Sequence, residues 1–130
     1  MTDWDDIARD NLKAAQVLAD QRQFRSSASR AYYAAFPAVS FVLKRRAPFG
    51  KGRETPAHHM VTTLMQEHLA PSLTAAKLRD MKATIRRLYN ERINADYKAG
   101  MTVDRLAALQ SQRDAHSLCR ELGVSHARRS

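Results

Sequence analysis

Residues 78–100, LRDMKATIRRLYNERINADYKAG, carry the most regular apolar pattern in the chain. The positions on this pattern recur at steps of three and four: Leu78, Met81, Ile85, Leu88, Arg92, Ala95 and Ala99. Because an α-helix has about 3.6 residues per turn, such steps place these side chains on one face. Gly100 follows, and glycine commonly ends a helix. The stretch predicts one long helix that packs against other helices.

Two helices are predicted on its N-terminal side. The first has Thr2 or Asp3 as its N-cap and fades over residues 21–23. The second spans about residues 25–46 and contains Pro37. Proline has no N–H to donate to the carbonyl four residues earlier, so we expect a kink. The apolar pattern resumes directly afterwards, which predicts that this helix continues beyond the proline.

A loop and a short helix separate these two from the long helix. Residues 47–56 are predicted to form a basic loop, because Gly and Pro recur in them. A short helix follows over about residues 58–69 and stops near Pro71. Ser72 or Thr74 is then the expected N-cap of the long helix.

One more helix completes the fold. Thr102 is its expected N-cap, Gly123 is its stop, and its apolar positions are Val103, Leu106, Ala107, Gln110, Leu118 and Leu122. Residues 125–130 are basic and are expected to form a flexible tail. Short connections make neighbouring helices antiparallel. The sequence therefore predicts an all-α fold, an up-and-down four-helix bundle with an extra short helix, over residues 1–124.

Composition limits the class of protein. The chain has 130 residues, 44% of them apolar, which fits one domain with its own core. Cys119 is the single cysteine, which excludes an intramolecular disulfide and fits a reducing compartment. The first residues resemble no secretion signal, and no apolar run approaches about 20 residues. We expect a cytoplasmic protein without a membrane span.

The charge balance indicates the kind of partner. Lys and Arg total 22 against 13 Asp and Glu, which gives a net charge of +9. Such a surface attracts nucleic acid, because neutralising phosphates supplies much of the binding free energy. The same charge can also dock an acidic protein, and the two partners do not exclude each other.

Arg92 breaks the best apolar pattern, because it stands between Leu88 and Ala95. A buried guanidinium must be paired, face a cavity or face another subunit. Asp96 comes four residues later on the same face and can pair with it. Tyr89, Asn94 and Tyr97 are within a turn. Either this is a satisfied ion pair at the end of a bundle, or it is part of a functional site.

Three blocks of sequence together resemble a HEPN domain, the "higher eukaryotes and prokaryotes nucleotide-binding" helical bundle. The first is RAYYAAF at residues 30–36, with an aromatic pair. The second is the Gly/Lys pattern of residues 50–52 followed by His58 and His59. The third is LYNERINADY at residues 88–97. The blocks come in the family's order, and the resemblance covers most of the chain.

That resemblance implies a reaction and partners. Many HEPN domains are metal-independent endoribonucleases that work as homodimers, with two copies of an Arg-x(4–6)-His motif at the dimer interface. The Arg holds the scissile phosphate of RNA and its developing charge, and the His moves the proton of the 2′-hydroxyl. Many are toxins paired with a small nucleotidyltransferase antitoxin. In some pairs the antitoxin adenylylates a tyrosine near the motif.

Mapped onto this sequence, the resemblance implies Arg92, Asn94, Asp96 and Tyr97 as the catalytic set. Tyr33, His59 and Tyr89 would line the cleft. Tyr97 stands where the motif has His, and a tyrosine of ordinary pKa, about 10, is a poor base at neutral pH. Tyr97 could instead be a modification site, or contact phosphate or base. Pro37 also departs from the family, which often has a polar residue there.

Other chemistry finds little support in the sequence. Arg53 with His58 or His59, and Arg120 with His126, also fit the Arg–His spacing, but such spacings arise by chance in an Arg-rich chain. His59 could turn toward the cleft or face solvent. No zinc-type Cys/His set, P-loop or Ser/Cys nucleophile pattern is present, so we expect no metal and no cofactor.

Two functional hypotheses remain. The first is a ribonuclease toxin, motivated by the resemblance, by Arg92 and by the basic charge. The second is a non-catalytic module that binds nucleotide or RNA and docks a nucleotidyltransferase, motivated by the missing His. Both imply a homodimer, because an apolar seam that carries Arg92 and Tyr97 needs cover. A helical adaptor with a merely solvated basic face is a third interpretation.

Overall fold

The computed structural model describes residues 4–46 and 58–123. Four sequence predictions lie outside these ranges: the Thr2 or Asp3 cap, the loop at residues 47–56, the Gly/Lys block within it, and the tail at residues 125–130.

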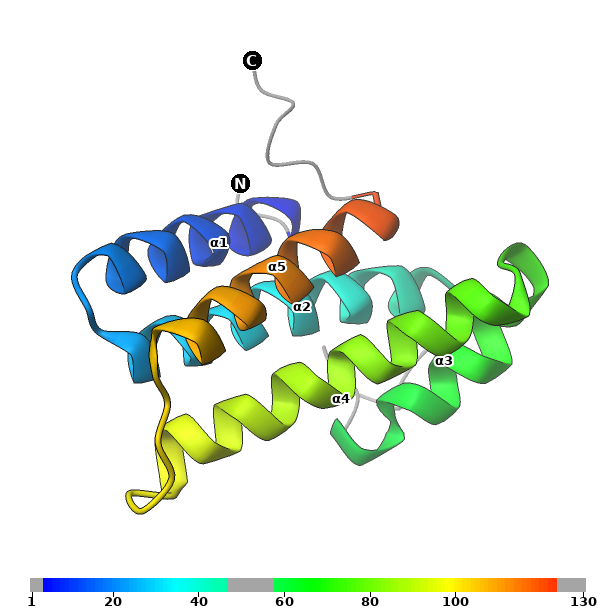
Figure 1. Cartoon of the computed structure of the whole chain (residues 1–130). Coiled ribbons are helices and arrows are strands. Elements are labelled where there is room, and N and C mark those ends of the chain that lie inside the picture. Colours follow the sequence, from blue (N-terminus) through cyan, green and yellow to red (C-terminus); the bar gives the residue numbers. More distant parts are fainter. Residues whose placement is uncertain (1–3, 47–57, 124–130) are drawn as a thin grey trace.

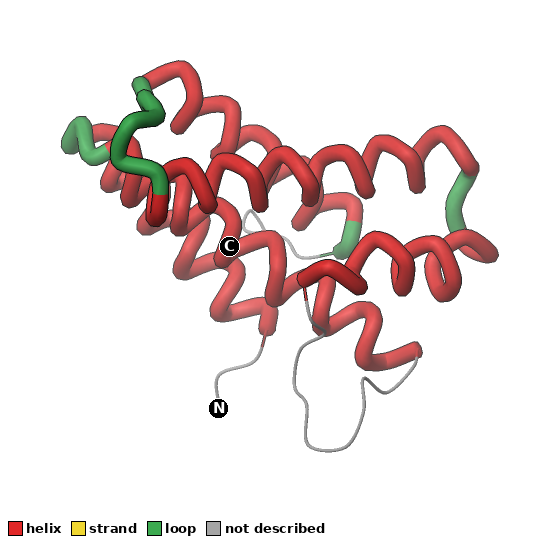
Figure 2. The backbone as a smooth tube through the Cα atoms, turned by 90° about the horizontal axis from the view of Figure 1, so that it is seen from below, coloured by secondary structure: helices red, strands yellow, loops and turns green. Residues whose placement is uncertain are grey.

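Every regular element in the described ranges is helical (Figure 2). In chain order the elements are α1 (Trp4–Asp20), α2 (Phe24–Arg46), the 3₁₀ turn η1 (His58–Met60), α3 (Val61–Leu69), the 3₁₀ turn η2 (Ala70–Ser72), α4 (Ala75–Tyr97) and α5 (Arg105–Glu121). The predicted all-α class is therefore confirmed.

The four long helices alternate in direction (Figure 1). In that view α1 and α4 run from right to left, and α2 and α5 run from left to right. Helix α2 is central, since α1, α3, α4 and α5 all pack against it. This arrangement confirms the predicted bundle with an extra short helix, and it brings the N-terminal half of α2 beside the C-terminal half of α4.

Small side chains explain why one helix can contact four others. The buried face of α2 is rich in alanine: Ala28, Ala31, Ala34, Ala35 and Ala38. Small residues let neighbouring helix axes approach closely, and larger side chains from the facing helices then fill the remaining space. Among these are Met65, Ile85, Leu88 and Leu118, each at most 1% exposed.

Helix α2 runs through Pro37 without interruption, as predicted. Proline leaves the carbonyl of Tyr33 without its usual helical donor. The side-chain Nδ2 of Asn11 on α1 fills that role and donates to the Tyr33 oxygen at 3.3 Å. The polar residue on the first helix therefore satisfies the group that the proline frees.

The N-cap of α4 is Thr74, one of the two predicted caps, and its hydroxyl accepts from the N–H of Lys77. Two other helix ends differ from the predictions. Helix α4 ends at Tyr97, before the expected Gly100. One reason is Arg25, which bonds the carbonyls at that end and so substitutes for a further turn: those of Asn94, Ala95, Lys98, Ala99 and Met101.

Helix α5 begins later than expected. Asp104, not Thr102, is the N-cap, and its carboxylate accepts from the N–H of Ala107 at 2.9 Å. Leu106 is 72% exposed and lies off the core-facing side, contrary to the predicted apolar face. Gly123 stops the helix as predicted, with a positive φ of 89° that glycine adopts without strain.

Two further expectations concern the core and the membrane. Cys119 is fully buried, and burial raises the pKa of its thiol to about 12, so it is a small core residue as predicted. In the ranges 4–46 and 58–123, none of the helices has the length and apolar character needed to cross a membrane.

Candidate functional site

Arg92, near the C-terminal end of α4, is held by three hydrogen bonds. Its Nε donates to the carboxylate of Asp96, one turn later, at 3.1 Å. Its Nη2 donates to the hydroxyls of Tyr33 at 2.7 Å and Tyr97 at 3.3 Å. The Arg92 side chain is only 17% exposed. Its third nitrogen, Nη1, bonds no residue in the described part of the chain, so one edge of the cation remains available.

Two residues of α2 fix this end of α4 in place. The hydroxyl of Ser29 donates to the Asp96 carboxylate at 3.1 Å. Arg25, one turn earlier, bonds the carbonyls of Asn94 and Ala95 at 2.9 and 3.0 Å. Because both contacts join α2 to the last turns of α4, they fix the position of α4 along α2 and so bring Arg92 level with Tyr33.

Three tyrosine rings, two from α2 and one from α4, lie around the guanidinium. The guanidinium carbon of Arg92 lies 5.3 Å from the ring centroid of Tyr33, 5.2 Å from that of Tyr97 and 5.8 Å from that of Tyr32. The adjacent rings of Tyr32 and Tyr33 pack edge to face at 5.2 Å. Cation–π contacts of this kind stabilise a partly desolvated guanidinium.

His58, the first residue of η1, joins the same cluster. Its ring stacks on that of Tyr89 at 3.4 Å with an interplanar angle of 15°. Its Nδ1 is 2.9 Å from the Tyr32 hydroxyl. The rings of Tyr32 and Phe36 complete its surroundings at 5.7 and 6.3 Å. The imidazole is therefore fixed on one face and at one nitrogen.

The electrostatics of the cluster give each group a defined charge. Burial opposes the charge of Arg92, but Tyr33, Tyr97 and Asp96 outweigh it and raise the pKa of the guanidinium. Burial raises the pKa of the Tyr32 hydroxyl well above its usual range, and Arg92 offsets this only in part. Burial, then Arg92 and His59, lower the pKa of His58 below its ordinary value. At neutral pH the cluster thus holds a cation, a protonated phenol and a neutral imidazole.

The structure gathers most of the residues that the sequence singled out. Tyr33, Asp96 and Tyr97 all bond Arg92. Tyr89 lies against Tyr32, at 5.7 Å between ring centroids, and against His58. The predicted Arg92–Asp96 pair is confirmed.

Two of the singled-out residues stand apart from the guanidinium. Asn94 is about half a turn round the helix from Arg92, and the hydrogen bonds from Arg25 and Lys98 reach its backbone oxygen. His59 is exposed, and the imidazole that packs into the cluster belongs to His58 instead.

A periodicity signal in the sequence could have separated the two histidines. His58, Val61, Met65 and Leu69 follow one another at steps of three, four and four, and the last three are buried. His58 therefore continues the apolar face of α3 backwards, whereas His59 continues its exposed face. No comparable signal marks Ser29 or Arg25, because their contacts depend on how α2 and α4 pack.

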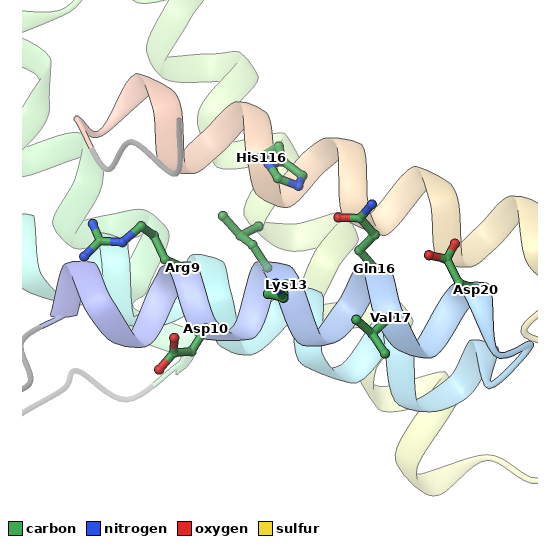
Figure 3. Close-up of a pocket in the computed structure, with 8 residues that line it drawn as sticks. Arg9, Asp10, Lys13, Gln16, Val17, Asp20 and His116 are labelled. Atoms are coloured by element: carbon green, nitrogen blue, oxygen red, sulfur yellow. The ribbon is translucent and has the colours of Figure 1, made fainter. Parts of the chain in front are cut away.

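We call the residues around this cation the Arg92 cluster: Tyr32, Tyr33, His58, Tyr89, Arg92, Asp96 and Tyr97. A shallow groove borders it. It is lined by Leu18, Ser26, Ser29, Arg30, Tyr33 and Asp96. A separate groove, which shares no residue with the cluster, lies between α1 and α5 and includes Lys13, Gln16 and His116 (Figure 3). Residues 4–46 and 58–123 contain no group of three or more His, Cys, Asp or Glu side chains placed to hold a metal ion.

Comparison with known proteins identifies the family. The family model described as HEPN domain matches residues 1–123, nearly the whole chain. No curated protein and no solved structure matches the chain. The three sequence blocks, the helical bundle and this match agree. The chain therefore belongs to the HEPN domain family, a family of nuclease and RNA-binding modules.

Proposed function

We propose that this HEPN domain is a metal-independent endoribonuclease, the toxin component of a toxin–antitoxin-type pair. The observation that carries the proposal is the Arg92 cluster, in which a largely buried cation keeps one free edge beside exposed tyrosine. Arg87 on the same helix instead directs two of its nitrogens at a single carboxylate, that of Asp114.

RNA is the substrate class that fits this cluster best. The free Nη1 of Arg92 can bind a phosphate oxygen, and the net charge of the protein, +9, favours a polyanion. Tyr97 is 68% exposed and presents a ring on which an unpaired base can stack. Each nucleotide of single-stranded RNA offers both groups, a phosphate and an unpaired base, on one ribose.

Each residue of the cluster then has a role. Arg92 binds the scissile phosphate and the charge that develops on it. Asp96, held by Ser29, keeps the guanidinium oriented. Tyr33 and Tyr97 hold its Nη2. Asn94 anchors this end of α4 through its backbone oxygen, and its half-buried side chain is placed to contact RNA only on the neighbouring face of the helix.

We expect the active form to be a homodimer. Three large apolar side chains are exposed between the end of α4 and the first turn of α5: Tyr97, Met101 and Leu106. Apolar side chains exposed together commonly mark an interface, and here they adjoin the Arg92 cluster. Light scattering that shows only a monomer at working concentration would contradict this part of the proposal.

The test is cleavage of a labelled single-stranded RNA in EDTA. We expect the wild-type protein to cut it and to leave the all-2′-deoxy version intact, because the 2′-oxygen is the nucleophile. Arg92→Ala should remove the activity. Arg86→Ala, at an exposed arginine of the same helix, is the matched control and should retain it. RNA left uncut by the wild-type protein would refute the ribonuclease.

Tyr97 supports a second candidate function, a module that docks a nucleotidyltransferase and accepts its nucleotidyl group. The favouring observation is an exposed phenol 3.3 Å from Arg92 at the motif's usual His position. Incubation with a minimal nucleotidyltransferase and ATP should add one AMP to the wild-type protein and none to Tyr97→Phe. Equal labelling of both proteins would rule out Tyr97 as the acceptor.

A further inference from the structure

The Arg92 cluster has no histidine on its own helix, because a tyrosine stands five residues after Arg92. An imidazole nevertheless reaches the cluster from a different element. We propose that His58 is the proton-transfer group of this site, and that it takes the proton of the RNA 2′-hydroxyl while Arg92 holds the adjoining phosphate. The inference rests on the proposed ribonuclease function and names its missing base.

Neighbouring side chains hold the ring of His58 firmly. Stacking on Tyr89 at 3.4 Å fixes the plane of the ring, and the contact between Nδ1 and the Tyr32 hydroxyl at 2.9 Å fixes its rotation. The Nε2 atom then bonds no residue in the two described ranges. A half-buried imidazole with one occupied and one free nitrogen is the arrangement that a general base needs.

His58 and Arg92 lie against the same aromatic ring. Both groups contact the ring of Tyr32, at 5.7 Å from the His58 ring and 5.8 Å from the Arg92 guanidinium carbon. They are close enough for the guanidinium to lower the pKa of the imidazole. In RNA the 2′-hydroxyl and the scissile phosphate are attached to the same ribose. His58 and Arg92 lie against one ring, so the imidazole can reach the hydroxyl while the guanidinium binds the phosphate.

The surroundings of His58 favour its neutral imidazole form. Among the residues that the structure describes, the groups that face His58 are Tyr32 from α2, Tyr89 and Arg92 from α4, and His59 from η1. None is a carboxylate that would favour the imidazolium. Burial, Arg92 and His59 all lower the pKa of His58. The ring is therefore neutral at pH 7, which is the form that accepts a proton.

The step balances without a further reactant besides water. The Nε2 of His58 removes the proton of the 2′-hydroxyl, and the 2′-oxygen forms a bond to phosphorus. The bond from phosphorus to the 5′-oxygen breaks, and that oxygen takes a proton from water. The hydroxide so formed takes the proton from the imidazolium, which restores the neutral base. The products are a 2′,3′-cyclic phosphate and a 5′-hydroxyl.

Adjacent histidines provide the matched test. His58→Ala should lower the rate constant of RNA cleavage by about 100-fold or more, with RNA affinity nearly unchanged, because a base acts on the chemical step. His59→Ala, at the exposed neighbour, should change it less than about two-fold. Added imidazole should restore part of the activity of His58→Ala, an effect that loss of a merely structural contact would not produce.

Tyr32 is predicted to be a positioning residue. Tyr32→Phe keeps the ring and removes the contact to Nδ1, so we expect about a ten-fold lower rate constant with RNA affinity retained. The pH profile of the wild-type rate should fall only below pH 6.5, because the pKa of His58 lies below that ordinary value. The acid limb of that profile should disappear in His58→Ala.

The outcomes separate this inference from the proposed function. Wild-type cleavage that Arg92→Ala abolishes and His58→Ala leaves intact would overturn the role of His58 and leave the ribonuclease standing. An absence of cleavage by the wild-type protein would overturn both. NMR signals of the His58 ring provide a readout without turnover: a bound 2′-deoxy oligonucleotide should shift them and leave those of His68 in place, and unshifted His58 signals in the bound state would refute the assignment.

Discussion

Arg87 and Arg92 lie five residues apart on α4, and the structure uses them in opposite ways. Arg87 donates through Nε and Nη2 to both oxygens of Asp114 on α5, at 3.1 and 3.0 Å. Asp114 is 7% exposed and also accepts from Gln110. Arg92 instead divides its donors among one carboxylate and two phenols, and in both arginines Nη1 bonds no residue in the described ranges.

The difference teaches how to separate a structural arginine from a functional one. A bidentate pair with a single buried carboxylate satisfies both partners and joins two helices. The hydrogen bond that Arg87 donates to Asp114 raises the pKa of the Arg87 guanidinium. Arg92 divides its donors between one partly exposed carboxylate and two phenols, so its surroundings orient the guanidinium without a bidentate pair. Four variants test this comparison.

The largest expected effect concerns the geometry of Arg92. Arg92→Lys keeps the charge but loses the planar fork that reaches Asp96, Tyr33 and Tyr97 at once. We expect RNA cleavage to fall by about 100-fold or more, measured as a single-turnover rate constant. A lysine variant with near wild-type activity would mean that only the charge matters.

The next effect concerns stability. Arg87→Ala leaves the buried carboxylate of Asp114 with Gln110 as its remaining hydrogen-bond partner in the described ranges, so we expect a loss of about 2 kcal/mol in the free energy of unfolding. Urea unfolding monitored by circular dichroism measures it. The double variant Arg87→Ala/Asp114→Ala should be more stable than Arg87→Ala alone, because no unpaired carboxylate remains. Equal stability of the two would contradict the assignment.

Arg25 links the two regions, since it caps the end of α4 that carries Arg92. Arg25→Ala removes hydrogen bonds to several carbonyls, and we expect about 1–2 kcal/mol less stability. Amide hydrogen exchange should quicken in the last turns of α4 and remain unchanged at its N-terminal end, which Thr74 caps. Uniform quickening along the whole helix would mean that Arg25 acts globally.

The smallest effect concerns the support behind Tyr33. Asn11→Ala leaves the Tyr33 carbonyl without its donor, at a cost of about 1 kcal/mol. In a Pro37→Ala background the N–H of the new residue 37 can bond that carbonyl, so Asn11→Ala should cost less there. A double-mutant cycle by urea unfolding measures the difference. Additive losses would show that Asn11 and Pro37 act independently.

Much of the fold could be predicted from the sequence, because helical periodicity is a local property. The long helices, the continuation through Pro37 and the stop at Gly123 all follow from it. The C-terminal end of α4 could not be predicted, because Arg25 reaches it from α2, 69 residues away in sequence. The predicted face of α5 included Leu106, which the later helix start places on the exposed side.

The site divides along the same line. Arg92 with Asp96 and Tyr97 could be identified on one helix, because steps of four and five place them within a turn. Tyr33 came from the family pattern alone. The sequence prediction chose His59, although the spacing of His58 from the buried residues of α3 favours His58, and the structure shows that His58 packs against Tyr32 and Tyr89.

The most direct test of the central claim measures Arg92→Ala and Arg87→Ala side by side, each for cleavage of the same RNA in EDTA and for unfolding in urea. The comparison predicts a crossed result. Arg92→Ala should lose cleavage while its free energy of unfolding falls by less than about 1 kcal/mol, and Arg87→Ala should lose stability while its folded form still cuts RNA. Parallel losses of activity and stability in both variants would contradict the claim that Arg92 is the functional arginine of α4.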